Sequence, residues 1–245
     1  MTDEIRPPHA PFLRFPGGAH CPIEPKEDAS QIYVGYNDPT QWHFFDRVEP
    51  KQLAQQVEWI TSWPKRSDTC QVFKQVLDTG ETIGTMGIHD IDMKNRTATT
   101  GSMMFNSAFW GKGWGHKAKM PLLDHAFNRL NLELIDSFVL EFNERSLRYC
   151  LSCGYKIDGF LPGRHLIEGK RYGRYVLSIT REAFEQVWEK FRKEHQIESF
   201  AEMLERTMQP RKKNWEKNEI PHTVRSLGDL SVGRDKSSHI SVRWS

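Results

Sequence analysis

The sequence has little that points to a membrane or to export. In its 245 residues no apolar run reaches the roughly 18 residues that a membrane-spanning helix needs. Residues 1–15 contain three prolines and no apolar segment of the kind that a secretory signal carries. We therefore expect a cytoplasmic protein that does not bind a membrane.

An excess of charge of one sign is also missing. The 34 Lys and Arg residues nearly balance the 32 Asp and Glu residues, and the net charge is +2. A protein that binds nucleic acid through its charge carries a basic field that this chain lacks. We expect a surface of mixed, solvated charges, and nucleic acid is not an expected partner.

Cysteine is scarce as well. Cys21 and Cys70 stand alone, while Cys150 and Cys153 form a C-x-x-C pair. A structural zinc site needs a second pair of ligands at suitable spacing, and the sequence offers none. We therefore expect no metal. We interpret the pair as two thiols on neighbouring turns of one helix face, in a reducing compartment.

What is present is a succession of strand and helix patterns. Residues 1–18, rich in proline and glycine, are expected to form an irregular arm. The expected order is then a strand (19–25), helices opening near Asp28 and Pro50, strands (70–76, 82–91 and 97–105), a helix after Gly115, a strand (134–140), a helix (144–152) and two strands (160–166 and 172–179). This order is typical of an α+β or mixed α/β domain with one mixed sheet.

Beyond residue 182 the composition changes. Two apolar stripes at helical spacing predict an amphipathic helical extension over residues 183–209. The first stripe is Phe184, Val187, Trp188 and Phe191, and the second is Ile197, Phe200, Met203 and Leu204. Each needs a covering surface, either the domain itself or a second subunit in a homodimer. Residues 210–245 are polar and are expected to be loosely ordered.

The clearest candidate binding site is the run Trp110-Gly111-Lys112-Gly113-Trp114-Gly115-His116, between a predicted strand and a predicted helix. Glycines let a ligand approach the backbone closely, and the N–H groups at a helix N-terminus attract an anion such as pyrophosphate. The spacing argues against two other phosphate-binding motifs. A dinucleotide fingerprint would need glycine in place of His116 or Ala118, and a Walker motif would need Ser or Thr after Gly-Lys.

A second motif completes the pattern. Asn143-Glu144-Arg145-Ser146 begins thirty residues after Gly113, and Gly154-Tyr155 begins eight residues after Ser146. With these motifs the chain resembles the GNAT superfamily of N-acetyltransferases, in the branch that contains ribosomal-protein N-terminal and spermidine acetyltransferases. That branch often has W-G-x-G-[YW]-[AG], then N-x-x-S and G-[FY] at these spacings. The resemblance covers roughly residues 19–182, which we take as the domain.

The resemblance implies a central mixed, mostly antiparallel sheet flanked by helices, with acetyl-CoA as cosubstrate. It places the CoA pyrophosphate on the backbone amides of residues 111–116. It places the pantetheine arm along residues 103–105, in a gap where two strands splay apart. The implied cofactor-binding residues are Met103, Met104, Phe105, Trp110, Gly111, Lys112, Gly113, Trp114, Gly115, His116, Asn143 and Ser146.

The implied reaction is direct attack of a neutral primary amine on the thioester. Such a reaction needs a base for the amine proton, donors for the developing oxyanion and an acid for the leaving thiolate. The acceptor is left open among a protein N-terminus, a polyamine, an amino sugar and an antibiotic. An alternative is a non-catalytic acyl-CoA-binding regulatory protein of the same fold.

Three departures from the family pattern affect the acid and the base. Cys150 stands where many members have a tyrosine acid, and Tyr149, one residue off, is expected to face elsewhere. Thr99 replaces a carboxylate that the branch often has, and Gly173 replaces an aspartate. The acid and base of the family therefore do not transfer directly to this chain.

Other residues are candidates for these roles. We expect His165 to be the base, because histidine changes its protonation near neutral pH. His89, Asp90 and Asp92 are further candidates. Ser146 is expected near the thioester sulfur, where its hydroxyl can donate a hydrogen bond.

Overall fold

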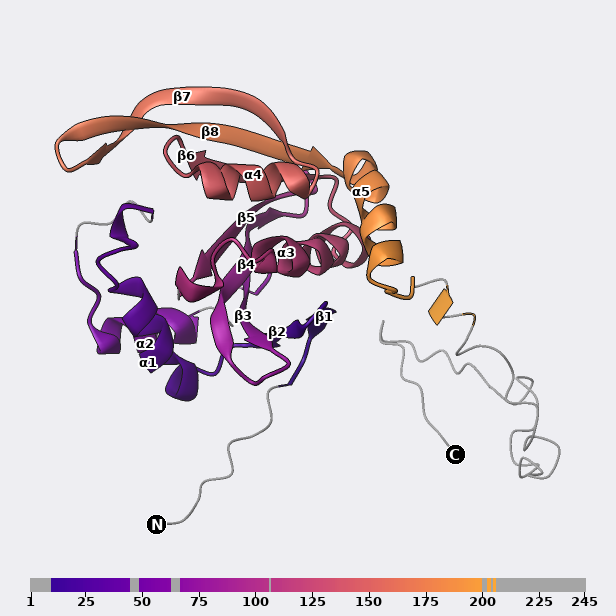
Figure 1. Ribbon diagram of the computed structural model, residues 1–245, viewed down its shortest axis with the longest axis horizontal. Helices are drawn as coiled ribbons and strands as arrows, with labels where there is room; N and C mark the ends of the chain where they lie inside the picture. The colour runs from indigo at the N-terminus through magenta and orange to yellow at the C-terminus, as the bar shows by residue number, and fades with distance from the viewer. Residues whose placement is uncertain are drawn as a thin grey trace, which may run out of the picture. The chain divides into compact units, whose positions relative to one another are not determined.

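The computed structural model describes residues 10–44, 49–62, 67–105, 107–199, 202–203 and 205. The chain divides into two compact units, Met1–Ile197 and Glu198–Ser245. In chain order the elements of the first unit are β1 (Leu13–Phe15), β2 (Gly18–Pro22), α1 (Pro25–Tyr36), the short helix η1 (Trp42–Phe44), α2 (Leu53–Ser62), β3 (Gln71–Leu77), β4 (Thr82–Asp92), β5 (Thr97–Met104), the short helix η3 (Ser107–Phe109), α3 (Trp114–Asp124), the π-helix η4 (His125–Arg129), β6 (Leu134–Leu140), α4 (Glu144–Ser152), β7 (Lys156–Ile167), β8 (Lys170–Thr180) and α5 (Arg181–Glu194) (Figure 1).

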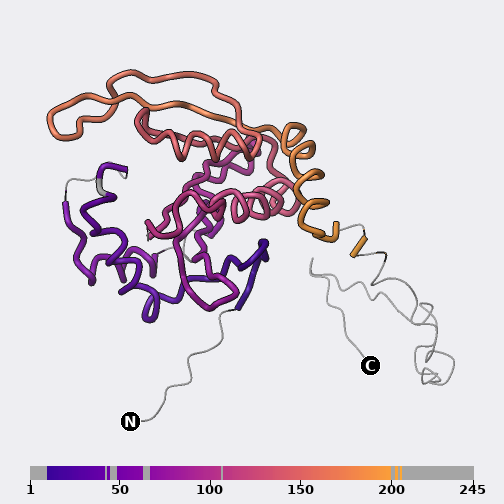
Figure 2. The backbone as a smooth tube through the Cα atoms, viewed as in Figure 1, coloured from indigo at the N-terminus to yellow at the C-terminus, as the bar shows by residue number. Residues whose placement is uncertain are grey.

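The described strands form one sheet in the order β1-β2-β3-β4-β5-β6-β8-β7. Neighbouring strands are antiparallel except β5 and β6, which are parallel. The predicted mixed, mostly antiparallel sheet flanked by helices is confirmed. Figure 2 follows the chain from the β4–β5 hairpin through α3 into β6.

The sheet begins earlier than the sequence pattern predicted. Strand β1 lies inside the segment 1–18 that was predicted to be irregular. Leu13 and Phe15 alternate inward and pair through a hairpin with β2. Gly17, at φ +91°, makes the turn possible, because this conformation strains any residue with a side chain. In the sequence pattern, the proline and glycine of this turn obscure the three-residue strand before it.

Two apolar clusters lie on opposite faces of the sheet. On β3, Val72 packs against the smaller cluster formed by α1 and α2, while the next residue, Phe73, belongs to the larger cluster that includes α3, α4 and α5. Successive side chains of a strand point to opposite faces, so α1 and α2 cover one face and α3 with α4 cover the other. The candidate site therefore has parts on both faces of the sheet, one under α1 and α2 and the other under α3 and α4.

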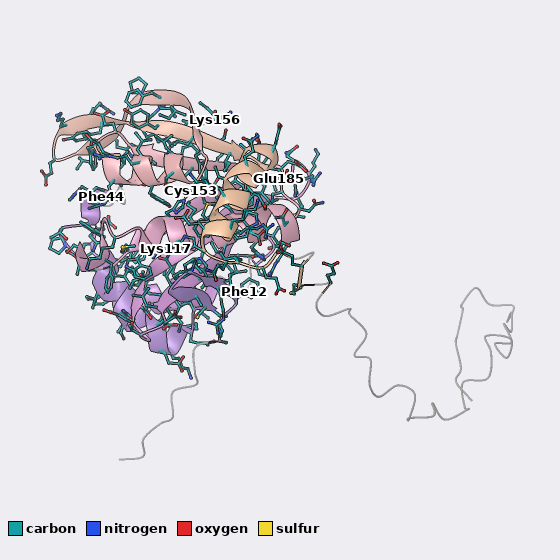
Figure 3. All side chains as sticks on the ribbon, turned by 45° about the vertical axis from the view of Figure 1, so that its right-hand side comes forward. Phe12, Phe44, Lys117, Cys153, Lys156 and Glu185 are labelled. Carbon is teal, nitrogen blue, oxygen red and sulfur yellow. The ribbon has the colours of Figure 1, made fainter. Side chains whose placement is uncertain are left out.

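Helix α5 belongs to the domain and is not an appendage to it. Phe184 is fully buried, and its ring stacks on that of Phe127 with 5.1 Å between centroids. Phe191 is also buried in the main cluster, whereas Glu185 lies on the exposed side of the helix (Figure 3). The first predicted stripe therefore covers the domain's own core, and the unit extends past the predicted boundary at residue 182. Phe200, Leu204 and residues 210–245 lie outside the described residues.

Candidate active site

The sheet splits between its two parallel strands. Strands β5 and β6 pair only where residues 97–99 lie beside residues 134–136. Beyond that point β5 stays paired with β4 as far as Met104, and β6 stays paired with β8 as far as Leu140. Next along the strands, the hydroxyl of Ser137 donates a hydrogen bond to the carbonyl of Thr100, at 3.4 Å. The strands therefore splay apart, as the resemblance implied.

A cavity of about 740 Å³ occupies the gap. Its walls are the end of β5, the glycine turn with the first turn of α3, the end of β6 and one side of α4, while Gln41 and Phe44 line it from the segment after α1. The cavity lies on the face of the sheet that α3 and α4 cover.

The glycine turn presents backbone amides to this cavity. Gly113 is the N-cap of α3 at φ +80°, and Gly111 also has positive φ. The first bond of the helix runs from the N–H of Lys117 to the carbonyl of Gly113. The N–H groups of residues 114–116 therefore have no carbonyl within the helix to bind. Together with the helix dipole they form a site suited to an anion.

Ten of the twelve predicted cofactor residues line the cavity. They are Met103, Met104, Trp110, Gly111, Gly113, Trp114, Gly115, His116, Asn143 and Ser146. Lys112 is exposed instead, with its ammonium 6.0 Å from the ring centre of Phe109. Phe105 packs against the α1/α2 cluster, because it follows the end of β5 and its side chain lies on the other face.

The Asn-x-x-Ser motif has a local structural role. Asn143 is the N-cap of α4, and its side-chain oxygen accepts a hydrogen bond from the N–H of Ser146 at 3.1 Å. This cap fixes where α4 begins, and one side of the helix faces the cavity. Arg145 and Arg148 lie on that side, and both line the cavity. The guanidinium of Arg145 lies 3.8 Å from the ring centre of Trp110, so positive charge stands beside the glycine turn. These arginines were not among the binding residues predicted from the sequence.

Tyr149 also lies on the cavity side, so the expectation that it faces elsewhere is wrong. Its hydroxyl is 2.9 Å from that of Ser102 on β5. Burial raises the pKa of this phenol well above its usual value. Cys150, at the position of the family's tyrosine, is buried in the core instead. The spacing from Asn143 could have shown this, because 145, 148, 149 and 152 share one helix face.

A buried lysine lies behind the cavity wall. Lys119, in α3, has no solvent exposure, and its ammonium donates a hydrogen bond to the hydroxyl of Thr100 at 2.8 Å. The rings of Tyr149 and Tyr155 flank it, with centres 5.4 and 5.5 Å from the nitrogen. Burial lowers the pKa of the amine. Its place beside Ala118 in an apolar stripe was the signal available in the sequence.

A second cavity, of about 200 Å³, lies against the face that α1 and α2 cover. Tyr36 of α1 and Trp59 of α2 line it together with residues of β3, β4 and β5. It shares three lining residues with the first cavity, Gly101, Ser102 and Met103. Residues 101–103 of β5 therefore line both cavities.

Of the candidate bases, His89 lies in the second cavity. Its Nδ1 is 3.2 Å from the sulfur of Cys70, and it pairs across the strands with Thr99, the position of the missing carboxylate. His165 lies on β7 opposite Tyr172 and lines neither cavity.

The two aspartates near His89 do not line the cavities either. Asp92 accepts hydrogen bonds from the backbone of the turn at residues 94–95, and Asp90 is exposed.

In the described part of the chain, no cluster of His, Cys, Asp or Glu has the makings of a metal site. The same part contains no helix with the length and apolarity that crossing a membrane requires.

Comparison with known proteins identifies the family to which this fold belongs. Residues 22–156 match the model of the acetyltransferase (GNAT) domain. An uncharacterized N-acetyltransferase, p20 of Bacillus licheniformis, is 30% identical over 161 residues, which cover 64% of this chain and 90% of the relative. The uncharacterized N-acetyltransferase YoaA of Bacillus subtilis is 24% identical over 63% of this chain and 89% of its own length.

Solved structures share the fold. The spermidine N-acetyltransferase of Vibrio cholerae, in complex with CoA and spermine, has a TM-score of 0.62 at 18% identity, covering 71% of this chain and 98% of that one. The microcin C7 self-immunity acetyltransferase MccE, in complex with acetyl-CoA and AMP, has a TM-score of 0.58 at 18% identity, covering 67% and 92%. The chain therefore belongs to the GNAT family and is an acetyltransferase.

Proposed function

We propose that the protein transfers the acetyl group of acetyl-CoA to a primary amine, with the cosubstrate in the first cavity. The observation that carries the proposal is the meeting of two features. A glycine turn caps α3 at one wall of the cavity, and the parallel strands β5 and β6 part at the other. The first feature suits a pyrophosphate, and the second leaves room for an extended arm.

The charge around the turn supports this placement. Residues 114–116 of the turn and Arg145 and Arg148 of α4 all line the same cavity, and Arg148 also forms an ion pair with Glu144 at 2.6 Å. Charge-assisted hydrogen bonds to phosphate oxygens are stronger than neutral ones. The CoA pyrophosphate therefore belongs at the start of α3, and the adjacent pantetheine arm follows the edge of β5 into the gap.

Backbone groups on β5 are available to the thioester. The carbonyl of Thr100 faces Ser137 on β6, whereas the N–H of Phe105 donates to the carbonyl of Ile83 on β4. Backbone groups of successive strand residues point in opposite directions, so the N–H of Met104 points into the gap. We assign it as the donor that stabilises the oxyanion.

The amine approaches from the second cavity. Its nitrogen attacks the thioester carbonyl carbon, the C–S bond breaks, and the amine proton passes to His89. The leaving sulfur carries the negative charge, which hydrogen bonds from the hydroxyls of Tyr149 and Ser146 stabilise before the thiolate takes a proton from solvent. His89 returns its proton to solvent, so the step is balanced.

The test is acetyl transfer with purified protein. Acetyl-CoA is incubated with a mixture of primary amines, free thiol is measured, and acetylated products are identified by mass spectrometry. Thiol release that depends on amine and yields N-acetyl products is the expected result. A protein that binds acetyl-CoA with no amine-dependent release would instead fit the alternative of a non-catalytic acyl-CoA-binding regulator.

A further inference from the structure

We propose that the acceptor is a compact primary amine with an aromatic or branched apolar side chain, bound in the second cavity with its nitrogen toward His89. This inference rests on the proposed function and specifies the substrate class of the same site. The cavity in question lies between the α1/α2 pair and strands β3 to β5.

The lining of the second cavity is aromatic and apolar. The rings of Tyr36 and Trp59 meet edge to face, with 5.5 Å between centroids. Val72 and Met103 contribute the aliphatic part. Apolar and aromatic walls stabilise an apolar group by removing it from water, and aromatic pairs add a preference for a further ring. The side chain of the acceptor therefore belongs between these walls.

Charged recognition groups are missing from the same lining. Among the described residues that line the second cavity, none is Asp, Glu, Lys or Arg. A polyamine carries further ammonium groups, and each one buried without a carboxylate costs free energy. The cavity therefore favours an acceptor whose only amine is the one that reacts.

The size of the second cavity argues for a compact acceptor. Its volume of about 200 Å³ is small beside the 740 Å³ of the first cavity. It is also below the roughly 300 to 1,000 Å³ of most ligand pockets. A single ring or a branched chain on a short linker suits this space, and a peptide segment does not.

Two glycines leave room for the imidazole of His89 at the end of the cavity where the amine would react. A Cβ added at Gly87 would lie 3.0 Å from Nε2 of His89, and one added at Gly101 would lie 3.4 Å from it. Both positions must stay small for the imidazole to lie over the strands. Gly101 is part of the stretch shared by both cavities, so an amine beside Nε2 lies next to the path of the thioester.

The first experiment compares acceptors. Values of kcat/KM are measured with saturating acetyl-CoA for phenylethylamine, isopentylamine, spermidine and a short peptide with a free N-terminus. We expect the two apolar amines to exceed spermidine and the peptide by at least about tenfold, equivalent to roughly 1.4 kcal/mol. Higher kcat/KM for spermidine or the peptide would overturn the inference and leave the proposed function standing.

A second experiment changes the charge of the cavity. Val72→Asp places a carboxylate in the lining, and Val72→Asn is the matched variant of the same shape without charge. We expect the Asp variant to shift the ratio of kcat/KM for spermidine over phenylethylamine upward by about tenfold relative to the Asn variant. Calorimetry should show unchanged CoA affinity in both.

The outcomes separate the two claims. Equal ratios in the two folded Val72 variants would overturn the assignment of the acceptor to this cavity. If no amine is acetylated by protein that binds CoA, the proposed function itself fails, and the inference fails with it.

Discussion

The ammonium nitrogen of Lys119 lies 2.8 Å from the hydroxyl oxygen of Thr100, at a point that solvent does not reach. This contact joins α3, which begins with the glycine turn, to β5, which borders both cavities. The hydroxyl of Thr100 is also 2.7 Å from that of Tyr155. We interpret the contact as a positioning interaction that fixes the glycine turn relative to the strand edge at which we propose that the thioester reacts.

Replacing this lysine should affect catalysis more than stability. Lys119→Met keeps most of the stem and removes the buried amine, and exchanging a buried charged group for an apolar one is often neutral or stabilising. We expect the free energy of unfolding to stay the same or rise, while kcat falls about tenfold or more. Lys117→Met, on the same helix with its ammonium 4.9 Å from the ring centre of Trp114, is the control. Equal kcat in both variants would contradict the positioning role.

The glycine turn can be tested with a pair of matched substitutions. Gly113 and Gly80 have φ of +80° and +85°, and a Cβ at either meets no atom within 4 Å. Alanine at each position should therefore cost a similar amount of stability, about 1 kcal/mol, because of the left-handed backbone. Only Gly113→Ala should weaken CoA binding, because its methyl group blocks approach to the amides. Unchanged affinity in calorimetry would remove the pyrophosphate from this turn.

The two histidines considered as the base make different predictions. A base must be neutral to accept the amine proton, so the rate falls at acid pH while the histidine is protonated. We expect His89→Ala to lower kcat and to flatten the acidic limb of the pH–rate profile. We expect His165→Ala, outside both cavities, to keep that limb. The reverse pattern would support the assignment of His165 made from the sequence.

Helix α5 should be essential to the stability of the domain. Phe184→Ala removes a fully buried ring that stacks on Phe127, and we expect a loss of about 3 to 5 kcal/mol in urea unfolding. Phe160→Ala, at a side chain 43% exposed on β7, should cost less than about 1 kcal/mol. Similar small losses in both variants would show that α5 is a detachable extension after all.

Acid should destabilise the fold through buried histidines. Burial lowers the pKa of His20 and of His125 to about 4, from the usual 6.5. As the pH falls from 6.5 toward 4, the unfolded chain binds protons that the folded protein does not, so the free energy of unfolding decreases. His20→Gln should reduce the loss between pH 6.5 and pH 5 by up to about 2 kcal/mol. An identical loss in wild type and variant would contradict this account.

Local patterns predicted much of the fold. The predicted bounds of β6 and α4, 134–140 and 144–152, match the structure, because an alternating strand and an Asn-capped helix are both defined by near neighbours in sequence. The glycine turn was found for the same reason, since its chemistry lies within seven consecutive residues.

The rest of the site depends on contacts between distant segments. The second cavity brings Tyr36 and Trp59 against β4 and β5, and no spacing along the chain indicates that meeting. The family resemblance placed Phe105 along the pantetheine arm, but β5 ends at Met104 and the ring of Phe105 packs against the α1/α2 cluster. Lys119 stands beside the apolar stripe of its helix in the sequence, but its hydrogen bond to Thr100 of β5 depends on tertiary packing.

The central claim is that acetyl-CoA binds between β5 and β6 with its pyrophosphate at the start of α3. The most direct test is a crystal structure of the complex with acetyl-CoA. The account predicts pyrophosphate oxygens within hydrogen-bonding distance of the amides of residues 114–116 and the thioester carbonyl beside the N–H of Met104. Acetyl-CoA bound elsewhere, or with its pyrophosphate away from the glycine turn, would contradict it.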